Sequence, residues 1–471
     1  SPDWADNLVG INSSSYSTDW PLTSGLWNSL TDSVTNYISV RVFDAAGSST
    51  AITDVFRVLK DTTTPAITDN QSGDDTWAGA AGTVYNVDFA DSGSRVSSAA
   101  YTAYTIAGKT GNLVKDWTQI FNSTGALTYI ADWPIDFNNS FQGFNYVSVK
   151  VWDIAGNTLE TVDAFYLKKD TAAPVITDLQ AGATTWYKAN PGNIFNVDFA
   201  DSGIGVSSAA FEAWTDLNKT GTNVAVSTVI FSGSPVAAYT ADWGPTAAQW
   251  ALLVQGTNYI SVTAYDGLAQ SSASIDVFYI LKDTTVPGAV SNLSAQTPAA
   301  AADEGNIYLT WTAPGDDGLT GNCSYYLIRY RTDVPVDGAN FDASSVYVST
   351  LTPKSPGTPE SLMMTGFTAG ATYYIAVKAA DKAGNLTISN STNNYAGTDK
   401  TPPGTVADLA AAEGSFEGQI ALNWTAPGDG TAGNPNLGTA ASYVVKYAIY
   451  QITGANFDAA AAYSQAWAPL A

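Results

Sequence analysis

Residues 146–153 show a pattern of apolar and polar positions that recurs through much of the chain. The two kinds of residue alternate, and successive side chains of a β-strand point to opposite faces of its sheet. The pattern therefore predicts a half-buried strand. We expect Val147, Val149 and Val151 to face a core, and the other face carries Tyr146, Ser148, Lys150 and Trp152.

A turn motif follows this strand. Residues 153–157 read Asp-Ile-Ala-Gly-Asn, and Gly and Asn tolerate the left-handed conformations that hairpin turns need. Related motifs occur at 44–47 and at 381–385. They predict the hairpin between the last two strands of a repeated unit.

The unit itself repeats with a period of about 110 residues, which matches one β-sandwich domain. Tyr-Asn-Val-Asp-Phe-Ala-Asp-Ser-Gly at 85–93 returns at 195–203 with Phe in first place. A second type of repeat follows, since residues 307–316 return with few changes at 420–429. The repeats predict a partial unit at 1–65, whole units at 66–174, 175–287 and 288–401, and a partial unit at 402–471.

Short segments with an aspartate and a proline join the units. Proline fixes its own φ and biases the preceding residue toward extended conformations, so we expect neighbouring units to lie end to end with restricted bending. The predicted shape is an elongated rod. The joints lie at 61–65, 170–174, 283–287 and 399–403.

Residues 288–401 resemble a fibronectin type III domain, and residues 402–471 resemble the front half of one. The matching residues are Pro287 and Leu293 on the first strand, Trp311 on the second, 326–330 on the third and Tyr373 at the tyrosine corner.

Residues 66–287, with the partial unit before them, resemble bacterial Ig-like modules in their Asp-Thr-Thr-x-Pro joints and Asp-x-Ala-Gly-Asn turns. They depart from fibronectin domains at one position, because Asn36, Asn145 and Asn258 stand where the corner tyrosine is expected. Both resemblances imply an all-β rod of tandem Ig-like and fibronectin type III β-sandwiches. They also imply an exported protein at the surface of a bacterium or archaeon, used for spacing, adhesion or assembly, and they imply no reaction.

Composition limits the possible functions. There are 43 acidic and 19 basic residues, and the net charge of −24 would repel nucleic acid. Histidine is absent, which removes the commonest general base and zinc ligand, and the single Cys323 excludes an intrachain disulfide. No apolar run approaches the roughly 20 residues of a membrane span. The start at Ser1, without Met or a signal peptide, indicates a mature or excised segment.

The joint aspartates are the candidate metal ligands. Carboxylates suit Ca²⁺, and a resemblance to calcium-rigidified adhesin rods implies calcium at such joints. Alternatively, an aspartate can cap a turn by bonding the main chain two residues on, which needs no metal. These aspartates are Asp61, Asp170, Asp283 and Asp399.

Other carboxylates lie in turns rich in Gly, Ser and Pro. Paired carboxylates could act as the acid and base of a glycosidase, but we expect these turns to be solvated, without the burial that raises the pKa of a catalytic acid. They are Asp91, Asp201, and the pairs Asp74–Asp75 and Asp316–Asp317.

Aromatic residues recur on the outward face of the penultimate strand of each Ig-like unit. Cross-strand pairing within the sheet is their default use, and contact with neighbouring molecules or stacking on sugars is the alternative. The residues are Tyr37, Phe43, Tyr146, Trp152, Tyr259 and Tyr265.

Together, these features predict a non-catalytic structural component of an extracellular fibre, sheath or surface layer that associates with identical chains. The alternatives are an adhesin or carbohydrate-binding stalk that contacts surface glycans, and the spacer of a larger secreted enzyme.

Overall fold

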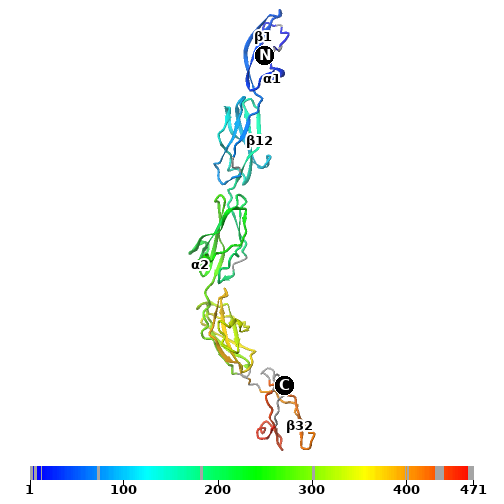
Figure 1. Cartoon of the computed structure of the whole chain (residues 1–471), viewed down its shortest axis with the longest axis vertical. Coiled ribbons are helices and arrows are strands. Elements are labelled where there is room, and N and C mark those ends of the chain that lie inside the picture. The colour runs from blue at the N-terminus through cyan, green and yellow to red at the C-terminus, as the bar shows by residue number, and fades with distance from the viewer. Residues whose placement is uncertain are drawn as a thin grey trace.

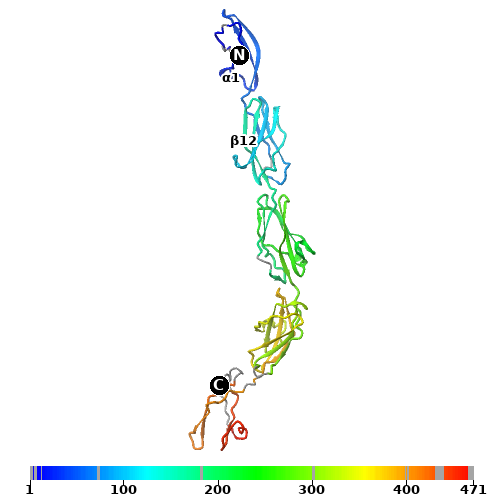
Figure 2. The same ribbon diagram turned by 180° about the vertical axis from the view of Figure 1, so that it is seen from behind.

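The computed structural model is an extended rod, with the N-terminal unit at one end and the C-terminal unit at the other (Figure 1). The view from behind shows the same end-to-end order (Figure 2). Each sheet lies within one of the ranges predicted from the repeats. The structure describes residues 4, 8–11, 13–71, 75–180, 184–299, 303–397, 399, 402–429 and 440–464.

The second unit is a β-sandwich. Its larger sheet has the order β4 (Trp77–Ala78), β12 (Thr158–Lys169), β11 (Gly143–Asp153), β7 (Val96–Ile106) and β8 (Thr110–Ala126). Its smaller sheet has the order β3 (Ala66–Asp69), β6 (Val87–Ala90) and β9 (Thr128–Tyr129), and β5 (Val84–Tyr85) pairs with β10 (Trp133–Pro134). Only the short β4 runs parallel to its neighbour among these described strands.

The third unit has the same architecture. Its larger sheet has the order β14 (Trp186–Tyr187), β20 (Ser271–Lys282), β19 (Gly256–Asp266), β16 (Val206–Trp214) and β17 (Asn223–Val236). Its smaller sheet has the order β13 (Val175–Asp178), β15 (Val197–Ala200) and β18 (Ala238–Tyr239). Two short helices, η1 (Leu217–Lys219) and α2 (Ala247–Leu252), lie in its loops.

The valines that the alternation predicted to face a core do so. Val147, Val149 and Val151 are completely buried and pack against the smaller sheet. In the second unit the rings of Tyr85 and Phe165 stack with centroids 4.6 Å apart. In the third unit, the equivalent rings of Phe195 and Phe278 stack at 4.7 Å.

The outward face of β11 differs from the prediction at Ser148, which is buried. The register between β11 and β12 shifts there, and Asp163 opposite the shift has a φ of 52°. The Ser148 hydroxyl accepts the Asp163 N–H at 3.0 Å, because the irregular ladder leaves this donor without a strand partner.

Asn145 replaces the tyrosine corner in the second unit. Its side chain is buried, accepts the N–H of Phe141 at 3.0 Å and donates to the carbonyls of Phe141 and Gly143 at 2.8 and 3.1 Å. In the fourth unit the Tyr373 hydroxyl accepts the Thr368 N–H at 3.1 Å, as a tyrosine corner does. Both side chains therefore fasten a loop to the penultimate strand.

The fourth unit has fibronectin type III topology. One sheet has the order β21 (Ser294–Gln296), β22 (Ile307–Thr312) and β27 (Pro359–Met364). The other has the order β26 (Ser345–Tyr347), β25 (Tyr325–Arg331), β28 (Thr372–Ala380) and β29 (Leu386–Ile388), with β30 (Thr392–Tyr395) also on β28. A hairpin of β23 (Gly315–Asp317) and β24 (Thr320–Asn322) and a short helix, η3 (Phe341–Ala343), complete the unit.

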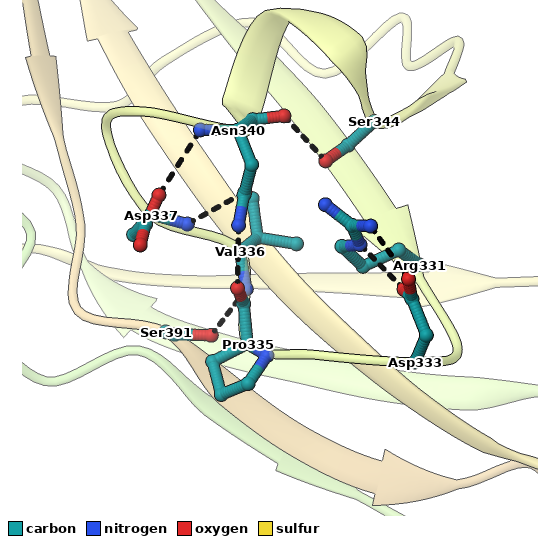
Figure 3. Close-up of polar contacts among 8 residues, drawn as sticks. All are labelled: Arg331, Asp333, Pro335, Val336, Asp337, Asn340, Ser344 and Ser391. Carbon is teal, nitrogen blue, oxygen red and sulfur yellow. Dashed lines mark hydrogen bonds and ion pairs between the residues drawn. The ribbon is translucent and has the colours of Figure 1, made fainter.

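The loop around η3 is held by local polar contacts (Figure 3). Arg331 binds Asp333 with two contacts of 2.6 Å, and the Asn340 amide donates to the Pro335 carbonyl at 2.9 Å. The fifth unit repeats the second contact, since Asn456 donates to Gln451 at 3.0 Å. Residues 338–343 and 454–459 share the sequence Gly-Ala-Asn-Phe-Asp-Ala, and this motif makes the same contact in both units.

The first and fifth units each contain two-stranded sheets among their described residues. The first has α1 (Ser24–Ser29), β1 (Val34–Phe43) and β2 (Ser49–Lys60). The fifth has β31 (Ala410–Glu413) with β32 (Ile420–Asn423), and β33 (Val445–Tyr447) with β34 (Ala461–Tyr463). Among the described helices, none is long and apolar enough to cross a membrane.

Candidate functional site: the interdomain joints

A lysine and an aspartate stand side by side where each Ig-like unit ends. The lysine side chain points back into its own unit, where Lys169 Nζ donates to the carbonyls of Phe137 and Ser140 at 2.9 and 3.0 Å. Lys282 donates in the same way to the carbonyls of Trp250 and Leu253. The lysine thus satisfies carbonyl groups that lie outside the sheets, in the segment before the penultimate strand.

The aspartate that follows caps the joint. One oxygen, Oδ1, accepts a main-chain N–H two residues on, at 3.1 Å in each of three joints. The capping role predicted for these aspartates is therefore confirmed at Asp61, Asp170 and Asp283.

The other oxygen of the same carboxylate reaches the next unit. Asp61 Oδ2 accepts the N–H of Ser94 at 2.6 Å, and Asp170 Oδ2 accepts that of Ile204 at 2.8 Å. A Cβ atom at Gly203 would stand only 2.0 Å from Asp170 Oδ2, so the glycine of the Asp-Ser-Gly turn leaves room for the carboxylate. One side chain therefore bonds to the main chain on both sides of the joint.

Two further aspartates of the next unit meet the joint aspartate. At the first joint, oxygens of Asp61, Asp91 and Asp153 lie within 4.8 Å of one another. Asp91 belongs to the Asp-Ser-Gly turn, and Asp153 ends β11 and begins the hairpin turn. The same positions hold Asp170, Asp201 and Asp266 at the second joint, and Asp283, Asp316 and Asp381 at the third.

The prediction that the Asp-Ser-Gly turns are solvated is wrong. Asp91 and Asp201 are each only 6% exposed, because the preceding unit and the hairpin turn cover them. Burial, together with the charges of Asp61 and Asp153, raises the pKa of Asp91. At the third joint, burial and the neighbouring carboxylates raise the pKa of Asp316 to about 6. Asp75 and Asp317 are exposed, and Asp74 lies outside the described residues.

A carboxamide holds the main chain at each of the first three joints. Asn157 donates from Nδ2 to the carbonyl of Asp61 at 3.1 Å, and Asn385 donates to that of Asp283 at 3.0 Å. Gln270 does the same for Asp170 at 2.7 Å. Since the amide comes from the hairpin turn of the following unit, it restricts the angle between the two units.

Side chains of the preceding unit also form hydrogen bonds with the first three joints. The Gln142 side chain accepts the N–H of Thr171 at 3.0 Å and contacts its hydroxyl, and Gln255 binds Thr284 in the same way. At the first joint Asp32 plays this part, accepting from the N–H and hydroxyl of Thr62 at 2.9 and 3.0 Å.

The chemistry of these clusters fits a hard cation. Asp266 is 2% exposed, and its Oδ2 has no hydrogen-bond donor among the described residues. Asp316 Oδ1 also has no hydrogen-bond donor among the described residues. It lies beside a pocket of about 230 Å³ that Lys282 and Lys382 also line. Buried carboxylate oxygens without donors are costly, and Ca²⁺ takes six to eight oxygen ligands.

Asp399, the fourth predicted ligand, is exposed, and its neighbours Thr398, Lys400 and Thr401 lie outside the described residues. The structure therefore places Asp61 in a cluster of three carboxylates, and Asp170 and Asp283 near the charges of the equivalent aspartates. Sequence reasoning missed their partners in the turns. A signal was present, because an aspartate recurs at both turn positions in both types of repeat.

The candidate lateral-contact aromatics lie on the outer sheet faces, where Tyr37, Phe43 and Tyr265 are exposed and Tyr146, Trp152 and Tyr259 are half-buried. Tyr146 pairs across strands with Tyr166, with ring centroids 5.8 Å apart, and Tyr259 pairs with Tyr279 at 6.2 Å. Lys168 lies over the Tyr166 ring and forms an ion pair with Asp75 at 2.9 Å.

Strand order and joints together define the class of this protein, which is a rod of tandem Ig-like and fibronectin type III-like β-sandwich domains. No protein-family model matches the chain. A segment of 107 residues is 32% identical to human calcium-activated chloride channel regulator 1, and it spans 22% of this chain and 11% of that protein.

Solved structures similar to this chain are also tandem β-domains. A tetra-tandem repeat from the extending region of a large adhesion protein has 13% identity and a TM-score of 0.26, covering 77% of this chain and 81% of that one. A bacterial ice-binding adhesin has 15% identity and a TM-score of 0.31, with 72% and 100% covered. Fibronectin(III)-like modules of Clostridium thermocellum CbhA have 15% identity and a TM-score of 0.24, with 49% and 98% covered.

Proposed function

We propose that this chain is a non-catalytic structural segment of an extracellular fibre, sheath or surface layer at a bacterial or archaeal surface, assembling with identical chains. The observation that carries the proposal is the repeated joint. Side chains of both neighbouring units form hydrogen bonds with its main chain. A flexible tether would need no such contacts. Joints with restricted bending suit a protein that has to keep a fixed extended length.

Electron microscopy of the purified chain tests this function. The rods are expected to form regular filaments or lattices at high protein concentration. Rods that stay isolated at every concentration, with freely varying joint angles, would overturn the proposal.

We also propose that the aspartate clusters bind calcium and that the ion stiffens the rod. The residues that would hold it at the second joint are Asp170, Asp201 and Asp266. A bound Ca²⁺ would supply the positive charge that the three carboxylates lack, and it would link the joint to two turns of the next unit. Ca²⁺ at 100 times its dissociation constant would stabilise the folded state by about 2.7 kcal/mol per site.

Calorimetry tests the calcium proposal. Asp266→Asn is expected to abolish the rise in melting temperature that millimolar calcium gives to the third unit. Asp242→Asn changes an exposed aspartate of the same unit and is the matched control. The same melting temperature in calcium and in chelator, for the unmodified chain, would end the proposal.

A further inference from the structure

The third unit has an open sheet edge. β17 is the outermost strand of its five-stranded sheet and pairs with β16 on one side. No described strand pairs with its other side. Open edges offer free main-chain donors and acceptors to other chains, and proteins commonly protect them with charged side chains.

The second unit protects the equivalent edge, on β8, and the third does not. The strand registers align the two edges, because Ala103 faces Lys115 as Ala213 faces Ala225, and Ala100 faces Gln119 as Ala210 faces Val229. Three polar residues of β8, Lys115, Asp116 and Gln119, are thereby replaced by Ala225, Val226 and Val229 in β17.

Asp116 of β8, which corresponds to Val226 of β17, makes a local hydrogen bond. Asp116 Oδ1 accepts the N–H of Trp117 at 2.8 Å, which occupies one main-chain donor of β8. Val226 cannot supply this acceptor. Other local contacts are kept, since Thr118 donates to the Asp116 carbonyl at 2.9 Å and Thr228 to the Val226 carbonyl at 2.7 Å. The two edge strands therefore have a similar backbone arrangement, and only β8 carries the polar side chains that protect an open edge.

The β17 edge is also apolar and uncharged. Val226 and Val229 are 72% and 61% exposed, and residues 220–241 contain no charged side chain. Two copies of a chain with a net charge of −24 repel each other over most of their surfaces. An uncharged edge is a place where identical chains can approach without opposing like charges.

We propose that the β17 edge is a contact surface for a second copy of this chain. The inference rests on the proposed self-assembly and names the surface that mediates it. A two-fold contact would set the exposed valines of each β17 against those of its partner. The register shifts along β17 limit regular strand pairing, so each contact is small and gains strength only when it repeats between neighbouring rods.

Exchange of residues between the two edges gives the test. Val226→Asp/Val229→Gln places the β8 residues in β17, and the second unit folds with these residues at the same positions. Sedimentation equilibrium is expected to show at least tenfold weaker self-association for this variant. Asn138→Asp adds the same charge at an exposed site of the second unit and should leave association unchanged.

The reverse exchange, Asp116→Val/Gln119→Val, is expected to strengthen association by creating a second apolar edge. A Val229→Cys variant should form disulfide-linked dimers with oxidised glutathione, and Gln119→Cys should not, because only β17 edges meet. Association that is unaffected by Val226→Asp/Val229→Gln would overturn the proposal that chains meet at the β17 edge, and the proposal that the chains assemble would remain. A chain that remains monomeric under all conditions would overturn both.

Discussion

The residue with the clearest titration behaviour is Asp316. Its carboxylate is partly buried beside Asp283 and Asp381, and its pKa is raised to about 6. An aspartate of the unfolded chain has a pKa of about 3.9, so the folded state binds this proton more tightly. The resulting stabilisation is complete below pH 4 and is lost as the pH rises through 6.

We therefore expect the fourth unit, in chelator, to be more stable at pH 5 than at pH 7 by about 1 kcal/mol. Asp316→Asn should remove most of this difference. Asp317→Asn, at an exposed neighbour whose charge adds less to the raised pKa than burial, Asp381 and Asp283 do, should keep most of it. Calorimetry at the two pH values measures the effect. Greater stability at pH 7 in the unmodified chain would contradict it.

At the scale of elements, the loop before the penultimate strand depends on one side chain. Asn145 makes three hydrogen bonds to main-chain groups of this loop, and Asn258 makes the corresponding bonds to Val254 and Gly256 in the third unit. Loss of the side chain leaves these groups without partners next to the core.

Asn145→Ala is expected to destabilise the second unit by about 2–3 kcal/mol, since buried main-chain groups lose their partners. Urea denaturation followed by hydrogen exchange resolves the units. The third unit, which keeps Asn258, serves as an internal control and should unfold unchanged. Equal destabilisation of both units would argue against a local role.

The strands and turns follow from local patterns in the sequence, such as the valines of 146–153, and the unit ranges follow from the repeats. The joint clusters do not. Asp61, Asp91 and Asp153 lie far apart in the chain and meet only because the sandwich closes and docks on the preceding unit. Burial of Asp91 depends on this docking, so the composition of its Gly- and Ser-rich turn gave the wrong expectation.

At the scale of the whole molecule, the shape of the rod depends on the side chains that bind the main chain at the joints. At the joint between the second and third units, each unit contributes one side chain. Gln142 accepts the N–H of Thr171, and Gln270 donates to the Asp170 carbonyl. Both are side chains whose described hydrogen bonds go to the joint, so their removal should loosen it without opening a core.

Gln142→Ala/Gln270→Ala is expected to broaden the distribution of angles at this joint in electron micrographs and to shorten the maximum dimension in small-angle X-ray scattering. The joint between the third and fourth units keeps Gln255 and Asn385 and should not change. Broadening at both joints alike would show that these side chains are not what fixes the angle.

The adjacent Lys169 and Asp170 also determine how the joint between the second and third units bears tension. A pull along the chain reaches Lys169 and Asp170 together, and their side chains are anchored in opposite directions, one in the unit behind and one in the unit ahead. Neither anchor can be drawn out alone, because the two residues share a peptide bond. Force is thus divided between two buried contacts at this joint before it reaches the strands of either domain.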